Sequence, residues 1–117
     1  MSSPITTHVL DTHLGRPAVG IQVTLFRSQS GQPGSEWVEI AQSRTNQDGR
    51  ITDWLEGQSR ETGVYKIEFE TDPYFDNQGL TCFYPNVTIT FRIQHPEQHY
   101  HVPLLISAHG MSTYRGS

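Results

Sequence analysis

Two histidines stand two residues apart near the C-terminal end of the chain, within the segment 99–106. The alternation of apolar and polar residues predicts that this segment is a strand, so both imidazoles would project from one face with Cα atoms about 6.5 Å apart. Imidazoles exchange protons near neutral pH, and His99 and His101 could therefore act on a shared ligand. The alternative is a solvent-facing polar stripe on an edge strand. His8, in the first predicted strand, could be a cross-strand neighbour of this pair.

A zinc site is a second use for the same three imidazoles. His-x-His on a strand, joined by one more histidine, is a ligand set that zinc accepts. No carboxylate or cysteine stands at a matching spacing nearby, so metal binding there could also be adventitious.

The last four residues of the chain are Tyr114, Arg115, Gly116 and Ser117. Chain ends are usually loosely ordered, and a frayed polar tail is one interpretation. The other is that the arginine, a glycine that permits close backbone approach, and a terminal serine with its carboxylate complete a polar site. Composition does not choose between the two.

Other familiar chemistries find no support in the sequence. It lacks paired acidic residues at a general acid and base spacing, a glycine-rich phosphate loop and a Gly-x-Ser-x-Gly motif. The single cysteine, Cys82, lies in an apolar stretch, where a buried and unreactive thiol is expected.

The elements that must position these residues are mostly short strands. Alternating apolar and polar residues predict strands over 5–10, 21–26, 37–41, 64–70, 86–93 and 99–106. A turn of the type Thr-Asn-Gln-Asp-Gly-Arg over 45–50 would place Arg50 at the start of a further strand. One short helix is expected from Thr71 or Asp72, as its cap, to about Gly79. Pro103 suggests an edge or bulged position.

Seven or eight short strands separated by polar turns favour an all-β sandwich of two antiparallel sheets. The chain has 117 residues, so a single domain over 1–117 is expected. Only 34% of the residues are hydrophobic, and the mean hydropathy is −0.52. Such a small core would benefit from further burial between subunits.

Charge and composition exclude several kinds of partner. The formal charge is −4 and the basic residues are scattered, so neither nucleic acid nor an anionic membrane is an expected partner. One cysteine allows no internal disulfide, which fits a reducing compartment. No apolar run approaches the roughly 18 residues that span a bilayer, and no leader is apparent, so a cytoplasmic location is preferred.

Three sequence motifs occur in an order that resembles the 5-hydroxyisourate hydrolases, the enzyme branch of the transthyretin-like family. They are Thr-His-Val-Leu-Asp over 7–11 with Gly-Arg-Pro-Ala over 15–18, the turn sequence over 45–50, and His-Val-Pro-Leu-Leu over 101–105 leading to Tyr-Arg-Gly-Ser over 114–117. The resemblance spans nearly the whole chain. The terminal Tyr-Arg-Gly-Ser is the feature that separates the hydrolases from hormone-carrying transthyretins. His109, Gly110 and Met111 depart from the commoner form of one loop.

The resemblance implies a transthyretin-like sandwich of two four-stranded antiparallel sheets with one short helix. It also implies a homotetramer, a dimer of dimers, with active sites in the channel where the dimers meet. His8, Arg50 and His101 are then the catalytic residues. The substrate-binding residues are then Tyr114, Arg115, Gly116, Ser117 and, as a neighbour of the site, His99. Relatives in this family occur in the cytoplasm, periplasm and peroxisome.

The activity that the resemblance implies is ring opening of 5-hydroxyisourate by water, which yields 2-oxo-4-hydroxy-4-carboxy-5-ureidoimidazoline in urate degradation. No cofactor and no metal are needed. Either His8 or His101 would remove a proton from water, and Arg50 would stabilise the negative charge that develops on oxygen. A small-molecule carrier is the competing class, but an apolar ligand channel gains nothing from cationic side chains that are costly to desolvate.

Overall fold

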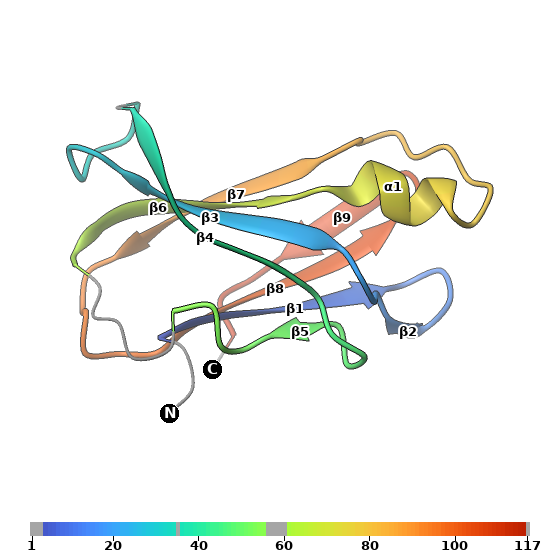
Figure 1. The fold of residues 1–117 in the computed structure, drawn as a ribbon, viewed down its shortest axis with the longest axis horizontal. Helices are drawn as coiled ribbons and strands as arrows, with labels where there is room; N and C mark the ends of the chain where they lie inside the picture. Colours follow the sequence, from blue (N-terminus) through green and yellow to red (C-terminus); the bar gives the residue numbers. More distant parts are fainter. Residues whose placement is uncertain (1–3, 35, 56–60, 117) are drawn as a thin grey trace.

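The computed structural model describes residues 4–34, 36–55 and 61–116, which form two stacked β-sheets and one short helix (Figure 1). The first sheet contains β1 (Ile5–Asp11), β2 (Arg16–Pro17), β5 (Arg50–Ile51), β8 (Tyr100–Ser107) and β9 (Gly110–Thr113). The second contains β3 (Gln22–Ser28), β4 (Trp37–Arg44), β6 (Gly63–Phe69) and β7 (Val87–Ile93). The helix α1 (Thr71–Asp76) follows β6 at one end of the sandwich. The predicted all-β sandwich is confirmed.

The strand order is β2-β1-β8-β9 in the first sheet, where β5 also pairs with β1, and β4-β3-β6-β7 in the second. The expectation of four strands in each sheet is wrong for the first sheet, which has five. The expectation that all pairs are antiparallel is also wrong, because β1 and β8 pair in parallel. These strands come from opposite ends of the chain, so no tight hairpin turn fixes their relative direction.

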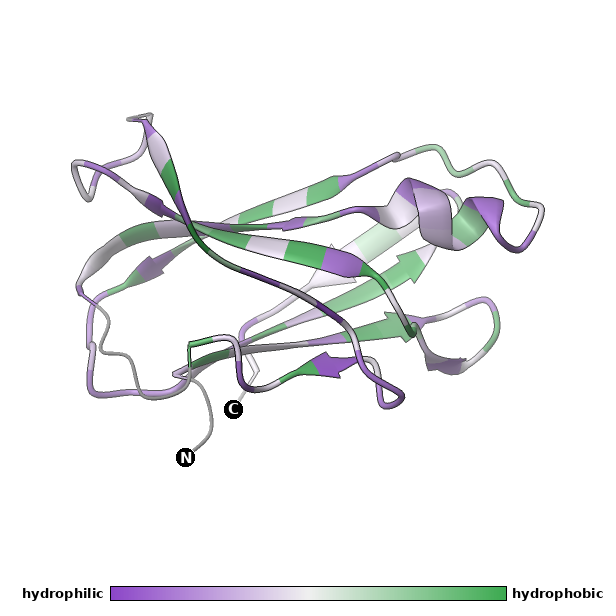
Figure 2. Cartoon of the chain, viewed as in Figure 1, coloured by the Kyte–Doolittle hydropathy of each residue, from purple (hydrophilic) through white to green (hydrophobic). Residues whose placement is uncertain are grey.

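The core lies between the sheets and follows the predicted alternation. Ile5 and Val9 of β1, Leu25 of β3 and Ile67 of β6 are fully buried. Figure 2 shows apolar positions along the strands, interleaved with polar ones. Because side chains alternate between the two faces of a strand, the remaining positions of β1 and β8 lie on the outer face of the first sheet.

The helix is shorter than expected and is not capped as expected. It ends at Asp76 rather than near Gly79, where the chain reverses through a positive φ of 72°. The N-cap position is Glu70, with no side-chain cap hydrogen bond. The Thr71 hydroxyl instead donates to the Tyr84 carbonyl at 2.7 Å. A contact with the segment that follows the helix has replaced the local cap.

Pro103 lies in an interior strand whose register with β1 has no shift, so the expectation of an edge or bulged position is wrong. β8 runs between β1 and β9. The ladder to the C-terminal segment begins at Leu104, opposite Thr113, and resumes as a single bridge between His101 and Gly116. Pro103 falls in the interruption, as expected of a residue that has no N–H group to donate to the ladder.

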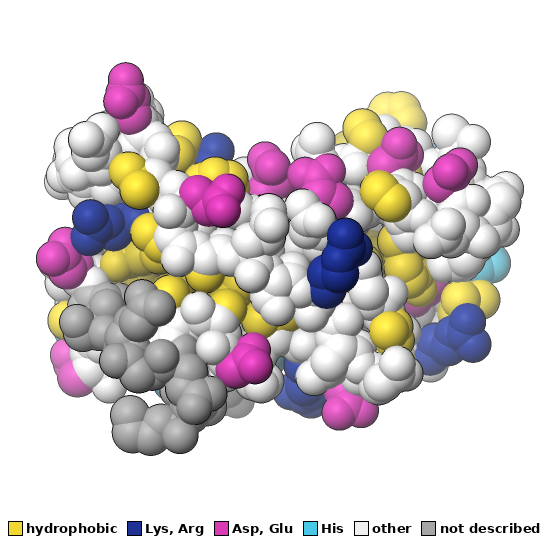
Figure 3. Space-filling model, viewed as in Figure 1, with side chains coloured by type: hydrophobic (Ala, Val, Ile, Leu, Met, Phe, Trp, Pro, Cys, Tyr) yellow, Lys and Arg dark blue, Asp and Glu magenta, His cyan; other side chains and the backbone are white. Residues whose placement is uncertain are grey.

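The surface seen in Figure 3 carries interspersed basic and acidic side chains, and neither sign forms a continuous patch on that face. Within the described residues, no helix is long and apolar enough to cross a bilayer.

Cys82 is buried, as predicted, and the pKa of its thiol is raised by burial and by the carboxylate of Asp72. A raised pKa leaves little thiolate at neutral pH, so this sulfur is a poor nucleophile.

Candidate active site

Strands β1 and β8 bring the N-terminal and C-terminal histidines onto one face. In the parallel register between them, Thr6 is the partner of His101 and His8 is the partner of Pro103. Paired residues share a face, and this face is opposite to that of the buried Ile5 and Val9. His8 and His101 therefore both lie on the outer face of the first sheet, and both are half-buried.

The turn over 45–50 places Arg50 beside His8. The Asn46 side-chain oxygen accepts hydrogen bonds from the backbone N–H groups of Asp48 at 2.9 Å and Arg50 at 3.0 Å. Gly49 has φ of 72°, and a Cβ there would lie 2.5 Å from the Val9 carbonyl oxygen. The Val9 N–H donates to the Gly49 carbonyl at 2.7 Å, which fixes the turn against β1. Only glycine allows both the positive φ and this close approach to the Val9 carbonyl.

With the turn held in this way, Arg50 is the direct partner of His8 in the β1–β5 register. Directly opposite residues of an antiparallel pair point to the same face of the sheet. The guanidinium and the two imidazoles thus share the outer face, so the structure brings together the three residues that the sequence resemblance marks as catalytic.

The surroundings of both imidazoles favour the neutral form over the protonated one. Burial lowers the pKa of His8, and repulsion from Arg50 lowers it further, although the backbone and carboxylate of Asp48 act in the opposite direction. The pKa of His101 is also lowered, first by burial and then by the positive charge of Arg50 and repulsion from His8 and His99. A neutral imidazole has a free lone pair, which is the form that a general base requires.

His99 and His101 both reach the hydroxyl of Thr6. The distances are 2.9 Å from Thr6 Oγ1 to His99 Nε2 and 2.8 Å to His101 Nδ1. The prediction that the two imidazoles lie on one face is therefore confirmed. His99 is exposed while His101 is half-buried, so a uniformly solvent-facing stripe does not describe the pair.

The C-terminal segment runs along the site. The Gly116 N–H donates to the His101 carbonyl at 2.9 Å, and a Cβ on Gly116 would lie 2.5 Å from His101 Cδ2. This part of the chain is therefore a paired segment and not a frayed tail. Ser117 lies outside the described residues.

Tyr114 and Arg115 border a hollow of about 270 Å³ next to His101. The Arg115 guanidinium lies over the Tyr100 ring, 4.4 Å from its centroid, and donates to the Gln98 side chain at 3.1 Å. Tyr114 is 61% exposed. Tyr100 is the partner of the core-facing Ile5 in the β1–β8 register, so the Arg115 guanidinium lies on the core-facing side of β8, opposite to the imidazole of His101.

Thr6 is the polar residue of this site that the sequence reasoning did not identify. It is buried beneath the imidazoles, with 5% of its surface exposed. A signal was present, because Thr6 stands two residues before His8 and therefore shares its face.

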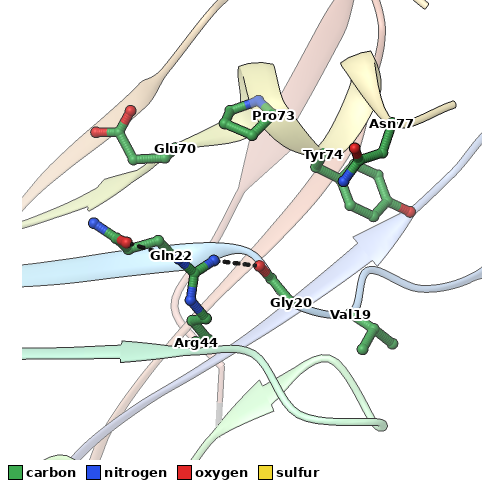
Figure 4. Close-up of a pocket in the computed structure, with 8 residues that line it drawn as sticks. All are labelled: Val19, Gly20, Gln22, Arg44, Glu70, Pro73, Tyr74 and Asn77. Atoms are coloured by element: carbon green, nitrogen blue, oxygen red, sulfur yellow. Dashed lines mark hydrogen bonds between the residues drawn. The ribbon is translucent and has the colours of Figure 1, made fainter. Parts of the chain in front are cut away.

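A second hollow of the structure lies apart from the histidines. A hollow of about 340 Å³ lies between β3, β4 and α1, away from the histidines (Figure 4). Its one guanidinium, that of Arg44, donates to the Gly20 carbonyl and to the Gln22 side chain and so stabilises the strand ends.

In the part of the chain that the structure describes, no three His, Cys, Asp or Glu side chains are grouped to hold a metal ion. The three-histidine zinc alternative therefore has no ready ligand set there.

Comparison with known proteins places this geometry in a family. The model of the HIUase/Transthyretin family matches residues 5–116. The chain belongs to this family. A probable 5-hydroxyisourate hydrolase of Schizosaccharomyces pombe is 45% identical over 115 residues, which cover 97% of this chain and 90% of that protein.

Solved structures of the HIUase/Transthyretin family share the fold over nearly the whole chain. The 5-hydroxyisourate hydrolase of Klebsiella pneumoniae superposes with a TM-score of 0.81 at 36% identity, covering all of both chains. Sea bream transthyretin in complex with thyroxine superposes with a TM-score of 0.87 at 30% identity, covering 97% of this chain and 94% of that one. The fold is common to hydrolases and carriers, so the side chains of the site must distinguish them.

Proposed function

We propose that this chain is a hydrolase that opens the ring of 5-hydroxyisourate with water, giving 2-oxo-4-hydroxy-4-carboxy-5-ureidoimidazoline in urate degradation. The observation that carries the proposal is the position of Arg50, directly opposite His8 and on the same sheet face as His101. Relatives that bear the hydrolase name match nearly the full chain at up to 45% identity.

The proposed reaction needs a base and a site for negative charge. One of the two neutral imidazoles removes a proton from water while the water oxygen bonds to the ring carbonyl carbon. The carbonyl electrons move onto oxygen, and Arg50 stabilises that anion. The C–N bond of the ring then breaks, and the leaving nitrogen takes the proton from the imidazolium. No cofactor enters this sequence of steps.

The remaining residues would hold the substrate. Gly116 stands against the His101 ring, and Tyr114 and Arg115 border the adjoining hollow. We assign these three residues, together with Ser117 and His99, to substrate binding. For this task the Arg115 side chain would have to leave Tyr100 and Gln98, and its planar donors would then pair with the amide oxygens of a polar heterocycle.

We propose a homotetramer formed as a dimer of dimers. β7 and β9 are edge strands of the two sheets, and residues of both, among them Phe91 and Thr113, line the apolar hollow beside His101. Unpaired edges of this kind are suited to strand pairing with another copy. The histidine-bearing face would then meet its counterpart in a second dimer, giving a mass four times the 13.3 kDa of the chain by light scattering. We also propose a cytoplasmic location, because the single cysteine is a free thiol and this fits a reducing compartment.

A carrier function is the second candidate, because thyroxine is bound by a transthyretin of the same fold. The two candidates are separated by following the ultraviolet absorbance of freshly generated 5-hydroxyisourate. The hydrolase proposal predicts that added protein accelerates the decay and that a chelator leaves the acceleration intact. Decay at the spontaneous rate would support the carrier, and loss of activity on chelation would support a zinc enzyme.

A further inference from the structure

The hydroxyl of Thr6 lies between two imidazole nitrogens, 2.9 Å from His99 Nε2 and 2.8 Å from His101 Nδ1. Thr6 is held rigidly, since it is 5% exposed and its backbone lies in the β1–β8 ladder directly beside His101. A β-branched side chain in a strand has few χ1 positions, so the oxygen has little freedom to leave this point.

A threonine hydroxyl has one hydrogen, and this limits the protons on its two neighbours. It can donate to only one of the imidazole nitrogens, and the other must carry its own N–H and donate to the hydroxyl oxygen. Three arrangements satisfy both contacts: the hydroxyl donates to one nitrogen and accepts from the other, in either direction, or it accepts from both and directs its hydrogen elsewhere. His101 carries its proton on Nδ1 in two of them and on Nε2 in the third. The proton positions of His99 and His101 are therefore linked through Thr6.

We infer that Thr6 is a positioning residue that accepts a hydrogen bond from His101 Nδ1–H and donates its own hydrogen to His99 Nε2. This arrangement leaves the lone pair of His101 on Nε2, the nitrogen at the opposite side of the ring from Thr6. The hydrogen bond at one imidazole nitrogen decides the protonation of the other, so a hydroxyl beneath the ring can prepare the base. In this arrangement Nε2 of the exposed His99 accepts the hydrogen bond that the Thr6 hydroxyl donates.

The inference rests on the proposed hydrolase function, because it assigns His101 Nε2 a proton to accept. Its test replaces Thr6 with valine, which keeps the shape and removes the hydroxyl, and with serine, which keeps the hydroxyl. Thr7→Val is the matched control, since the Thr7 hydroxyl is buried on the same strand but donates to the Val102 carbonyl at 2.6 Å on the core side.

Two measurements are made on each variant. The ultraviolet assay gives kcat and KM for 5-hydroxyisourate. Nitrogen-15 NMR of histidine-labelled protein at about pH 8, above the ordinary imidazole pKa, shows which ring nitrogen of His101 carries the proton. The His101 signals are assigned by their loss in His101→Gln.

In the wild type, Nδ1 of His101 is expected to carry the proton and Nε2 to lack it. Thr6→Val is expected to mix the tautomers and lower kcat roughly tenfold to a hundredfold with KM nearly unchanged, the range found for residues that orient metal-bound imidazoles. Thr6→Ser should restore both readouts towards the wild type. Thr7→Val should lower thermal stability without changing the His101 tautomer or kcat.

An unprotonated Nδ1 in wild-type His101 would overturn the inference, as would a Thr6→Val protein with wild-type kcat. Should the wild type fail to hydrolyse 5-hydroxyisourate, the proposed function fails. The NMR comparison then decides the positioning role alone: a wild-type tautomer that is lost only in Thr6→Val supports it, and a tautomer unchanged in Thr6→Val overturns it.

Discussion

Arg50 lies directly opposite His8 across the pair formed by β5 and β1, although the two residues are far apart in the sequence. The short strand that carries Arg50 is held by the Asn46 side chain and by Gly49, whose backbone touches that of Val9. A fixed positive charge beside two half-buried imidazoles disfavours their protonation. This relationship links the turn chemistry of the chain to the acid–base chemistry of the site.

Replacing Arg50 with glutamine removes this charge, and two effects are expected. The rate should fall roughly a hundredfold to a thousandfold, the range seen when a group that stabilises an oxyanion is lost. The pKa values of His8 and His101 should rise towards their ordinary value, because Arg50 lowers both. The base works in its neutral form, so the acidic limb of the kcat/KM profile should move to higher pH. The profile of the residual activity is the measurement.

Arg44→Gln provides the matched control for Arg50, because Arg44 is an exposed arginine of the other sheet. It should leave both the rate and the acidic limb unchanged. An acidic limb that stays in place in Arg50→Gln would show that Arg50 does not set the protonation of the base.

Gly116→Ala should impair turnover through contact with His101. The added Cβ would lie 2.5 Å from His101 Cδ2 and 3.1 Å from Cγ, so the ring must move. A displacement of about 1 Å in a reacting group costs on the order of a hundredfold in rate. Steady-state kinetics measure this loss, and calorimetry should show a small change in melting temperature. Gly110→Ala is the control, since its Cβ would have an ordinary contact with Ser107 at 3.6 Å. Equal activity in the two variants would contradict the proposed closeness of Gly116 to the reacting imidazole.

Tyr74→Phe should destabilise the fold and make it more sensitive to acid. The Tyr74 hydroxyl of α1 donates to the buried Asp11 carboxylate of β1 at 2.7 Å. Burial alone would raise the pKa of Asp11, but hydrogen bonds from Tyr74 and from the backbone of Leu14 and His13 outweigh it and hold the pKa below its usual value. Their contribution to stability is present above the ordinary aspartate pKa and is lost as the pH falls through the lowered one.

In Tyr74→Phe the pKa of Asp11 rises, so acid unfolding should begin at a higher pH. The unfolding free energy at neutral pH should fall by about 1–3 kcal/mol, the cost of removing one hydrogen bond from a buried charged group. Urea unfolding over a range of pH measures both effects. The exposed Tyr84 gives the control variant Tyr84→Phe. Equal losses in both variants would show that the Asp11 contact adds nothing.

Periodicity was sufficient for most of the sandwich because one face of each long strand is buried. Tyr65, Ile67 and Phe69 alternate in the sequence, which predicts one shared strand face, and all three are buried in β6. The two-residue strands are different. β2 (Arg16–Pro17) is too short to show any alternation, and the sequence there reads as a turn. Pairing with β1 makes it a strand, and such pairing is a tertiary property.

The sequence indicated most residues of the site, but it did not indicate which strands pair to bring them together. Turn chemistry placed Arg50 at the start of a strand, but nothing in the local sequence pairs that strand with β1. The parallel pairing of β1 with β8, which sets Thr6 beside His101, joins the two ends of the chain and leaves no local pattern. The sequence could place Thr6 on the same face as His8, but it could not show that Thr6 lies beside His101.

The most direct test of the account is the decay rate of freshly generated 5-hydroxyisourate, followed by ultraviolet absorbance with wild-type, His101→Ala and Arg50→Ala protein at equal concentration. We predict rapid decay with the wild type and decay close to the spontaneous rate with either variant, while circular dichroism shows all three folded. Spontaneous decay with the wild type, or wild-type rates in both variants, would contradict it.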